Sequence, residues 1–493
     1  MSDAFYDVIV VGTELAGLVA AAMLAKRNYR VLVLGHGPSA SEFHIDGIRY
    51  SRRPSLFSGF ETSGLIKRAF AELALSVEMQ NRPKVFEPHY QVVMPGRRID
   101  LSSKEAILQR EFEREFPDDL DRIQQFYRIV RDGNVKLSKL LDEVPVLPPD
   151  GFFEGRAWRK LLAASLEPGI ADPLSLFPEG HPFRAFALAP LAFSSGCQMT
   201  PHSVVQLVRL QSHLGRGLYD IEGGVDKLKR IFIDKVKSNC GDFRDRATIE
   251  KLVTKRGKVR EVILKDRREV LGCEAVICNM DLKRFFSLIP QEDQNERFHL
   301  KMLELQPVSA IYTTNFAVKA DAIPVGMANH VFQIESVKRP LEGENAVLIS
   351  VDPSGPQDDP SIRVITVSTR LPARSVRLTP ENVVAMDERL AQCVKNVVPF
   401  FDEHLVARAP GCLSIDRRTG EPSVDATLLA PVYASALEDT LDTTPVAART
   451  AYKNVFVAGD QLYTGLGFEG AFFGSLNVLK LTTELVTRKT LLN

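Results

Sequence analysis

Residues 6–21 read YDVIVVGTELAGLVAA and decide how the chain is expected to begin. The β-branched run before Gly12 predicts a buried strand, and the residues rich in alanine, leucine and methionine at 15–27 predict a helix. A second buried strand is expected at 30–34. A strand, a glycine turn, a helix and a strand in this order form the context of the dinucleotide-binding fingerprint G-x-G-x-x-G. The stretch therefore predicts a Rossmann-type βαβ unit.

One letter of this fingerprint differs. Gly12 and Gly17 occupy its first and third glycine positions, but Glu14 follows Thr13 at the second. The first glycine permits the tight turn and the third permits close packing of helix on strand, whereas the second lets the backbone approach a pyrophosphate. A carboxylate is favourable at a helix N-terminus. Glu14 is therefore expected to occupy the place where a phosphate group normally lies.

The end of the second predicted strand departs from the pattern as well. An acidic residue about 20 residues after the fingerprint normally binds the ribose hydroxyl. Gly35 stands at that position, and the next carboxylate is that of Glu42. From this half of the chain two interpretations stay open. The βαβ unit is kept for packing alone, or it holds a nucleotide in an altered way.

Composition limits the classes of function. A length of 493 residues predicts two or three domain-sized units. Lys+Arg and Asp+Glu both number 62, and this balance argues against a nucleic-acid partner. The longest apolar run, 15–25, is shorter than the roughly 20 residues of a membrane-spanning helix, so we expect neither an anchor nor a signal peptide. The six cysteines form no C-x-x-C pair, which predicts a cytoplasmic protein without a metal site.

A second glycine-rich stretch lies near the C-terminus. Residues 454–458 predict a strand, Gly459 and Asp460 follow it, and a helix is expected from about Ala471. A glycine-rich loop that leads into a helix N-terminus is suited to an anion or a flavin. A carboxylate just past the end of a strand is well placed to bind a polyol hydroxyl. The stretch therefore predicts a second ligand-binding loop.

Three separated segments, 6–21, 219–281 and 455–471, resemble the phytoene desaturase and carotenoid isomerase family of the flavin amine-oxidase superfamily. Their order and spacing extend over the whole chain. The resemblance implies an α/β fold in which a Rossmann-like FAD-binding domain is interleaved with an α+β substrate domain of antiparallel sheet and helices. The implied boundaries are 1–84, 216–284 and 441–493 for the FAD-binding domain, and 85–215 and 285–440 for the substrate domain.

The resemblance also implies FAD and a set of residues around it. The residues placed at the cofactor are Gly12, Thr13, Glu14 and Gly17 at the pyrophosphate, Gly35 at the ribose, the backbone near Ile249 at the adenine, Arg53 where a glycine is usual beside the flavin, Gly459 and Asp460 at the ribitol, and Gly467, Phe468, Glu469 and Gly470 at the flavin end. Catalytic residues are not assigned.

Three functions remain open. The favoured one is an FAD-dependent oxidoreductase that dehydrogenates or isomerises an apolar substrate, with Arg52 or Arg53 offsetting the charge of Glu14. The second is a cofactor-free relative that holds a lipid or prenyl-type ligand, as Rab GDP-dissociation inhibitors of the same superfamily do. The third is a scaffolding subunit. The intact Gly459-Asp460 and GLGFEGA stretches favour the first.

The remaining segments predict the substrate half. Short alternating runs in 303–369 predict antiparallel strands, and residues 110–145 predict one or two amphipathic helices. The apolar stretch 184–196 is expected to line a tunnel. Trp158 lies beside three basic residues on a predicted helix, which suits peripheral contact with a membrane or packing on the core. Packing is the preferred interpretation.

Overall fold

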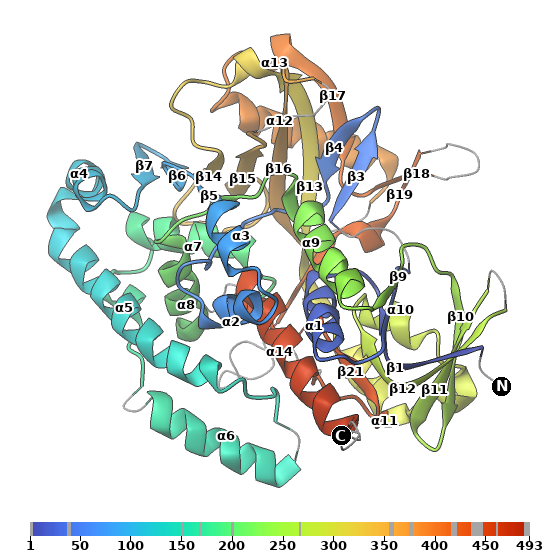
Figure 1. The fold of residues 1–493 in the computed structure, drawn as a ribbon. Helices are drawn as coiled ribbons and strands as arrows, with labels where there is room; N and C mark the ends of the chain where they lie inside the picture. The colour runs from blue at the N-terminus through green and yellow to red at the C-terminus, as the bar shows by residue number, and fades with distance from the viewer. Residues whose placement is uncertain are drawn as a thin grey trace.

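The computed structural model describes residues 3–36, 41–149, 151–166, 169–198, 202–265, 268–353, 359–373, 378–415, 422–434, 447–459 and 462–487. Two large sheets dominate it (Figure 1), one at the lower right and one at the top of the view. A group of long helices lies beside them on the left. The predicted mixture of a Rossmann-like sheet, a second sheet and helices is confirmed.

The lower sheet carries the predicted βαβ unit. Its strand order is β10-β11-β12-β1-β2-β9, and β21 pairs with β12. The pairs around β1 are parallel, as they are in a Rossmann-type sheet, whereas β10 and β11 form an antiparallel extension. The bounds are β1 (Ala4–Val11), β2 (Val31–Leu34), β9 (Asp242–Arg244), β10 (Ile249–Lys255), β11 (Lys258–Leu264), β12 (Val270–Cys278) and β21 (Val455–Val457).

Helix α1 (Leu15–Lys26) is buried on all sides from Leu15 to Ala25. It packs against α9 (Gly224–Ser238) and α14 (Phe468–Leu485), two helices from distant parts of the sequence. A helix enclosed in this way has no polar face to present, which explains its uniformly apolar composition. The packing brings the N-terminal ends of α1 and α14 to the same region of the molecule (Figure 1).

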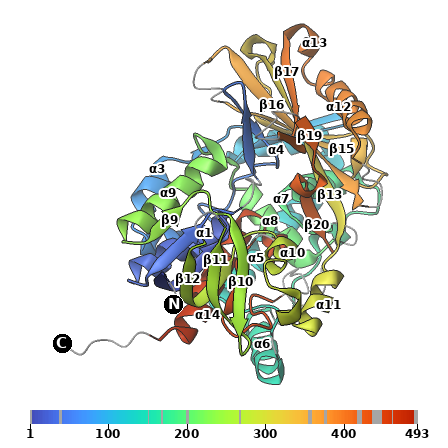
Figure 2. The ribbon, with the colours of Figure 1, turned by 90° about the vertical axis from the view of Figure 1, so that its right-hand side faces the viewer.

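The upper sheet has the order β17-β13-β16-β15-β14-β6-β7, with β20 paired to β13. The strands expected in 303–369 form β13 to β16 and pair antiparallel. Helix α12 covers the outer face of this sheet (Figure 2). The bounds are β6 (Tyr90–Met94), β7 (Arg97–Leu101), β13 (Pro307–Lys319), β14 (His330–Ile334), β15 (Ala346–Val351), β16 (Ile362–Pro372), β17 (Leu405–Pro410), β20 (Ala430–Tyr433) and α12 (Pro380–Lys395).

The segment expected to form one or two amphipathic helices forms α4 and α5. Trp158 of α6 packs into the core, as the preferred interpretation predicted. No helix in the described ranges is long and apolar enough to cross a membrane. The remaining helices are α2 (Gly64–Glu72), α3 (Ser76–Asn81), α4 (Glu105–Glu115), α5 (Leu120–Asp142), α6 (Gly151–Leu166), α7 (Pro182–Ser194), α8 (Val204–Leu214), α10 (Leu282–Phe286), α11 (Glu296–Glu304) and α13 (Phe401–His404). The small strands are β3 (Glu42–Ile45), β4 (Ile48–Ser51), β5 (Lys84–Val85), β8 (Tyr219–Asp220), β18 (Leu413–Ile415) and β19 (Pro422–Val424).

Candidate functional site

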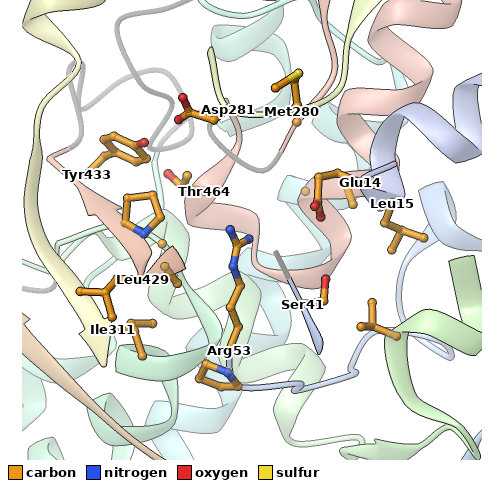
Figure 3. A pocket seen from close by; sticks show the side chains of 18 of the residues that line it. Glu14, Leu15, Ser41, Arg53, Met280, Asp281, Ile311, Leu429, Tyr433 and Thr464 are labelled. Carbon is orange, nitrogen blue, oxygen red and sulfur yellow. The ribbon is translucent and has the colours of Figure 1, made fainter. Parts of the chain in front are cut away.

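A cavity of about 600 Å³ is lined by loops of the lower sheet and by strands of the upper one. Figure 3 shows Glu14 and Leu15 on one side of it and Ile311, Leu429 and Tyr433 on the other. One wall comes from the loops that follow β1 and β12, and the opposite wall comes from β13 and β20. The cavity therefore contacts both of the glycine-rich stretches and the apolar upper sheet.

The two retained glycines of the fingerprint are required by Asn279, at the end of β12. A side chain at Gly12, whose φ is +106°, would overlap the Asn279 backbone, and one at Gly17 would overlap its amide. The amide oxygen of Asn279 accepts from the Gly17 N–H at 2.9 Å, and its NH₂ group donates to the carbonyl oxygens of Gly12 at 3.2 Å and Glu14 at 2.7 Å. The glycines thus serve packing of the loop, a role that the sequence alone did not reveal.

Glu14 is held by a cation that sequence reasoning missed. Its Oε2 lies 3.3 Å from the Nζ of Lys229 on α9, and the same ammonium donates to the Ser41 hydroxyl at 3.0 Å. Burial would raise the pKa of Glu14, but Lys229 and then Arg53 outweigh it and hold that pKa below its ordinary value. The carboxylate is therefore ionised and paired.

Only one of the two candidate arginines faces this carboxylate. The guanidinium of Arg53 extends into the cavity between Glu14 and the Tyr433 side (Figure 3). Arg52 does not face Glu14. Its guanidinium lies over the Phe43 ring and donates to the carbonyl oxygens of Gly411 and Leu413.

On the adenosine side of the predicted site, backbone atoms fill the space that a side chain at position 35 would need. A side chain at Gly35 would overlap the carbonyl oxygen of Asp245, so no acidic residue fits there. The next residue, His36, does line the cavity. Its Nδ1 lies 3.0 Å from the Ala247 carbonyl oxygen and 3.3 Å from the backbone nitrogen of Ile249. The Ile249 N–H that the resemblance places near an adenine therefore faces an imidazole.

The glycines at the start of α14 allow this helix to pack close to neighbouring backbone. A Cβ at Gly467, whose φ is +57°, would lie 2.6 Å from the Ser194 carbonyl oxygen, and one at Gly470 would lie 2.5 Å from that of Tyr463. Phe468 lines the cavity and meets the Phe57 ring edge-on, with centroids 5.4 Å apart. At Gly459, in contrast, an added Cβ would meet no atom of the described residues within 4 Å. Asp460 lies outside the described residues.

Glu469 lies behind this wall and makes a buried ion cluster. Its carboxylate accepts two hydrogen bonds from Arg209, at 2.8 and 2.6 Å, and one from the Nε2 of His213 at 3.1 Å. Burial would raise the pKa of Glu469, but Arg209 and His213 bring it far below its ordinary value. Burial is also the main reason why the pKa of His213 is lowered. The imidazole is therefore neutral, with its proton on Nε2 and with Nδ1 facing the Thr62 hydroxyl.

The opposite wall is apolar. It includes Ile311 of β13, Leu429, Tyr433 of β20 and Phe193 of α7. The C-terminal end of the stretch expected to line a tunnel, from Phe193 to Gly196, does line the cavity. Across the described ranges, no three His, Cys, Asp or Glu side chains are grouped so as to hold a metal ion.

The neighbourhood of Lys229 also predicts a pH dependence of stability, through Glu42. Burial and then the adjacent Asp226 raise the pKa of Glu42 to about 7, against the opposing effect of Arg49 and Lys229. A raised carboxyl pKa means that the folded state binds the extra proton, so its stability falls as the pH rises from about 4.5 to about 7. The substitution Glu42→Gln should stabilise the protein at pH 8 by roughly 2–3 kcal/mol more than at pH 5.

Urea unfolding of both proteins at the two pH values measures this difference. The exposed Glu250 of β10 provides the matched control, Glu250→Gln, which makes the same change at a side chain in solvent. An equal effect of Glu42→Gln at both pH values would show that Glu42 is ionised throughout.

Comparisons with known proteins agree with this architecture. The family model of the NAD(P)-binding Rossmann-like domain matches residues 10–73. Prolycopene isomerase 2 of an Oncidium hybrid cultivar is 25% identical over 449 residues, which cover 84% of this chain and 73% of the relative. The zeta-carotene-forming phytoene desaturase of Myxococcus xanthus is 23% identical over 283 residues, covering 56% and 53% of the two chains. The sequence is therefore similar to carotenoid isomerases and desaturases, in agreement with the resemblance to the phytoene desaturase family.

Solved structures share the fold of this chain over nearly its whole length. Cyclohexylamine oxidase from Brevibacterium oxydans has a TM-score of 0.57 at 12% identity, and the alignment covers 97% of this chain and 99% of that one. An oxidoreductase from Methanosarcina mazei has a TM-score of 0.56 at 16% identity, with 96% and 99% covered. The chain thus shares the fold of these proteins while it departs from the dinucleotide-binding fingerprint at Glu14.

Proposed function

We propose that this protein is an FAD-dependent oxidoreductase that dehydrogenates or isomerises an apolar substrate. One observation carries the proposal: a single cavity joins the N-terminal ends of α1 and α14 to the apolar wall of β13 and β20. A pocket of this size, apolar with a few convergent polar groups, suits a small-molecule site. The similarity to relatives named prolycopene isomerase and phytoene desaturase supports an apolar substrate of the carotenoid kind.

The residues present fit a flavin nucleotide in a modified way. The open space next to Gly459 leaves room at the α14 end. At the α1 end the charge of Glu14 is neutralised by Lys229 and Arg53, so a diphosphate would not meet an uncompensated carboxylate. His36 stands beside the place of the missing ribose acid, where it would supply a polar contact.

Bound FAD would supply the acceptor for a hydride from a C–H bond next to a polyene. The chain would contribute binding and the exclusion of water. Ile311, Leu429 and Tyr433 would hold the apolar substrate, and Phe468 would separate it from the buried ion cluster at Glu469.

A cofactor-free function as a lipid-binding protein is the second candidate, and three observations favour it. Glu14 already pairs with Lys229, Gly35 admits no acidic side chain, and the Ile249 N–H faces His36. In that case the apolar wall would hold a lipid or prenyl-type ligand without chemistry, and the α1 end would serve packing.

Titration with FAD separates the two functions. The protein purified from its own host should show flavin absorption in the near-ultraviolet and blue, and the apoprotein should quench the fluorescence of added FAD with a Kd of roughly micromolar or tighter. A polyene that the protein dehydrogenates should then bleach the flavin bands when it is added without oxygen, because its hydride reduces the flavin. A colourless protein that takes up no FAD and carries a lipid extractable by organic solvent would contradict the oxidoreductase and support the second candidate.

A further inference from the structure

The ammonium of Lys229 is buried where a solvated lysine would be expected. The side chain is 8% exposed, although Lys227, two residues earlier on α9, is exposed to solvent. Burying a cation is unfavourable unless it is paired and hydrogen-bonded. The geometry of the helix therefore directs one particular cation toward the end of α1.

The ammonium of Lys229 can bind a further acceptor besides Glu14. Its N–O distance of 3.3 Å is longer than the 2.7–2.9 Å of a strong charge-assisted hydrogen bond. An ammonium has three N–H donors, and in the described part of the chain two of them have acceptors, at Glu14 and Ser41. Both partners line the cavity, as Lys229 itself does. A ligand in the cavity can therefore reach the same ammonium.

The N-terminus of α1 lies at the same end of the cavity as this ammonium. Glu14 is the N-cap residue of this twelve-residue helix, but its side chain makes no capping hydrogen bond to the N–H groups of the first turn. Its carboxylate turns instead to the buried lysine. Arg53 extends into the cavity beside it (Figure 3) and also favours its ionised form. Two cations and a helix N-terminus thus surround one carboxylate, and all three would attract a phosphate.

We propose that Lys229 is a phosphate ligand of this cavity, which binds the diphosphate of a flavin nucleotide in place of the backbone approach that a glycine at position 14 would allow. Glu14 is the counterion that the diphosphate displaces from this ammonium. The inference rests on the proposed function, and it accounts for a fingerprint that tolerates a carboxylate at its centre. It also predicts that Lys229 contributes to the binding of ligands that carry phosphate and does not contribute to the binding of the flavin ring alone.

The test compares FAD with riboflavin, which has the same ring system but no phosphate. Lys229→Met should weaken FAD binding at least about tenfold and leave riboflavin binding unchanged. Glu14→Gln should strengthen FAD binding by about tenfold, because the ammonium no longer has to exchange partners. Lys227→Met, an equal change of charge on the same helix, should alter neither Kd.

The double variant Lys229→Met, Glu14→Gln shows whether Lys229 binds the phosphates or only neutralises the charge of Glu14. If Lys229 contacts the phosphates, Lys229→Met still weakens FAD binding about tenfold when Glu14→Gln is already present. If it only compensates Glu14, the loss disappears in that background, and the inference is overturned. The double variant removes one charge of each sign, so it also shows whether any loss comes from an unpaired buried charge. Thermal unfolding of each variant confirms that it is folded.

A failure of the proposed function gives a different pattern. A wild-type protein that binds neither FAD nor riboflavin contradicts the flavoenzyme, and calorimetry with inorganic pyrophosphate then tests Lys229 by itself. Binding of pyrophosphate that Lys229→Met abolishes would sustain the phosphate site. The absence of pyrophosphate binding to both the wild type and Glu14→Gln would overturn it.

Discussion

Gly459→Leu is expected to lower the affinity for FAD by about a hundredfold while the protein stays folded. Gly459 follows β21 and lines the cavity, and an added Cβ at this position meets no atom of the described residues within 4 Å. We therefore expect a leucine side chain to extend into the cavity. It would occupy volume that the flavin nucleotide needs next to the N-terminus of α14.

The measurement is the same fluorescence titration, together with thermal unfolding of the apoprotein. Gly155 of the exposed helix α6 offers a matched control, because a Cβ there also meets nothing within 4 Å. Gly155→Leu should change neither the Kd nor the unfolding midpoint appreciably. If Gly459→Leu bound FAD as tightly as the wild type, the nucleotide would not lie against the end of β21, and the orientation implied by the superfamily would be wrong for this chain.

The parts of the fold that sequence predicted are those where local composition decides the outcome. The apolar run before Gly12 has to form a buried strand, and the alanine-rich segment after Glu14 has to form an enclosed helix. The alternating runs of 303–369 in the same way form the antiparallel strands β13 to β16. Neighbouring residues supply most of the information for such elements.

The partners at the site depended on contacts between distant segments. Lys229 lies 215 residues after Glu14, on a helix whose spacing shows only amphipathicity. Arg52 and Arg53 are adjacent in the bend that follows β4, where no strand alternation fixes which side chain faces the cavity, so sequence could not choose between them. Gly35 looked like the loss of a ribose ligand, but the backbone of Asp245 already fills the space that a side chain would need.

The retained glycines illustrate the same limit from another side. Gly12 and Gly17 match the fingerprint, yet both are required by Asn279 whether or not a nucleotide is bound. Their presence is therefore weak support for a cofactor. The open space at Gly459 is stronger support, because packing of the described residues does not fill it.

Arg209→Met is expected to destabilise the protein by about 3–5 kcal/mol at pH 8. The guanidinium and the Glu469 carboxylate are almost completely buried and form two hydrogen bonds. Arg209 also donates to Asn134 at 2.6 Å and to Ser138 at 2.8 Å, so that one side chain joins α5, α8 and α14. Its removal would leave a buried carboxylate with a neutral imidazole and a hydroxyl as its neighbours.

The pH dependence of this loss follows from the direction of the pKa shift. In the wild type the pKa of Glu469 is far below its ordinary value of 4.5, so the cluster stabilises the fold above about pH 4.5. Without Arg209 burial dominates and raises that pKa, because it disfavours the charged form. The folded variant would then bind a proton that the unfolded chain releases, and its stability would fall as the pH rises above 4.5. Arg209→Met should therefore be less harmful at pH 5 than at pH 8.

Thermal unfolding at the two pH values checks this order, and the double variant Arg209→Met, Glu469→Leu separates charge from packing. Replacing both partners of a buried ion pair by apolar residues is often neutral, so the double variant should be more stable than Arg209→Met alone at pH 8. Arg131→Met on α5 is the control, because its guanidinium is 72% exposed. A double variant no more stable than the single one would mean that the bonds to Asn134 and Ser138, and not the charge of Glu469, make Arg209 essential. The first turn of α14, which carries Phe468 against the cavity, would then depend on α5 more than on the ion pair behind it.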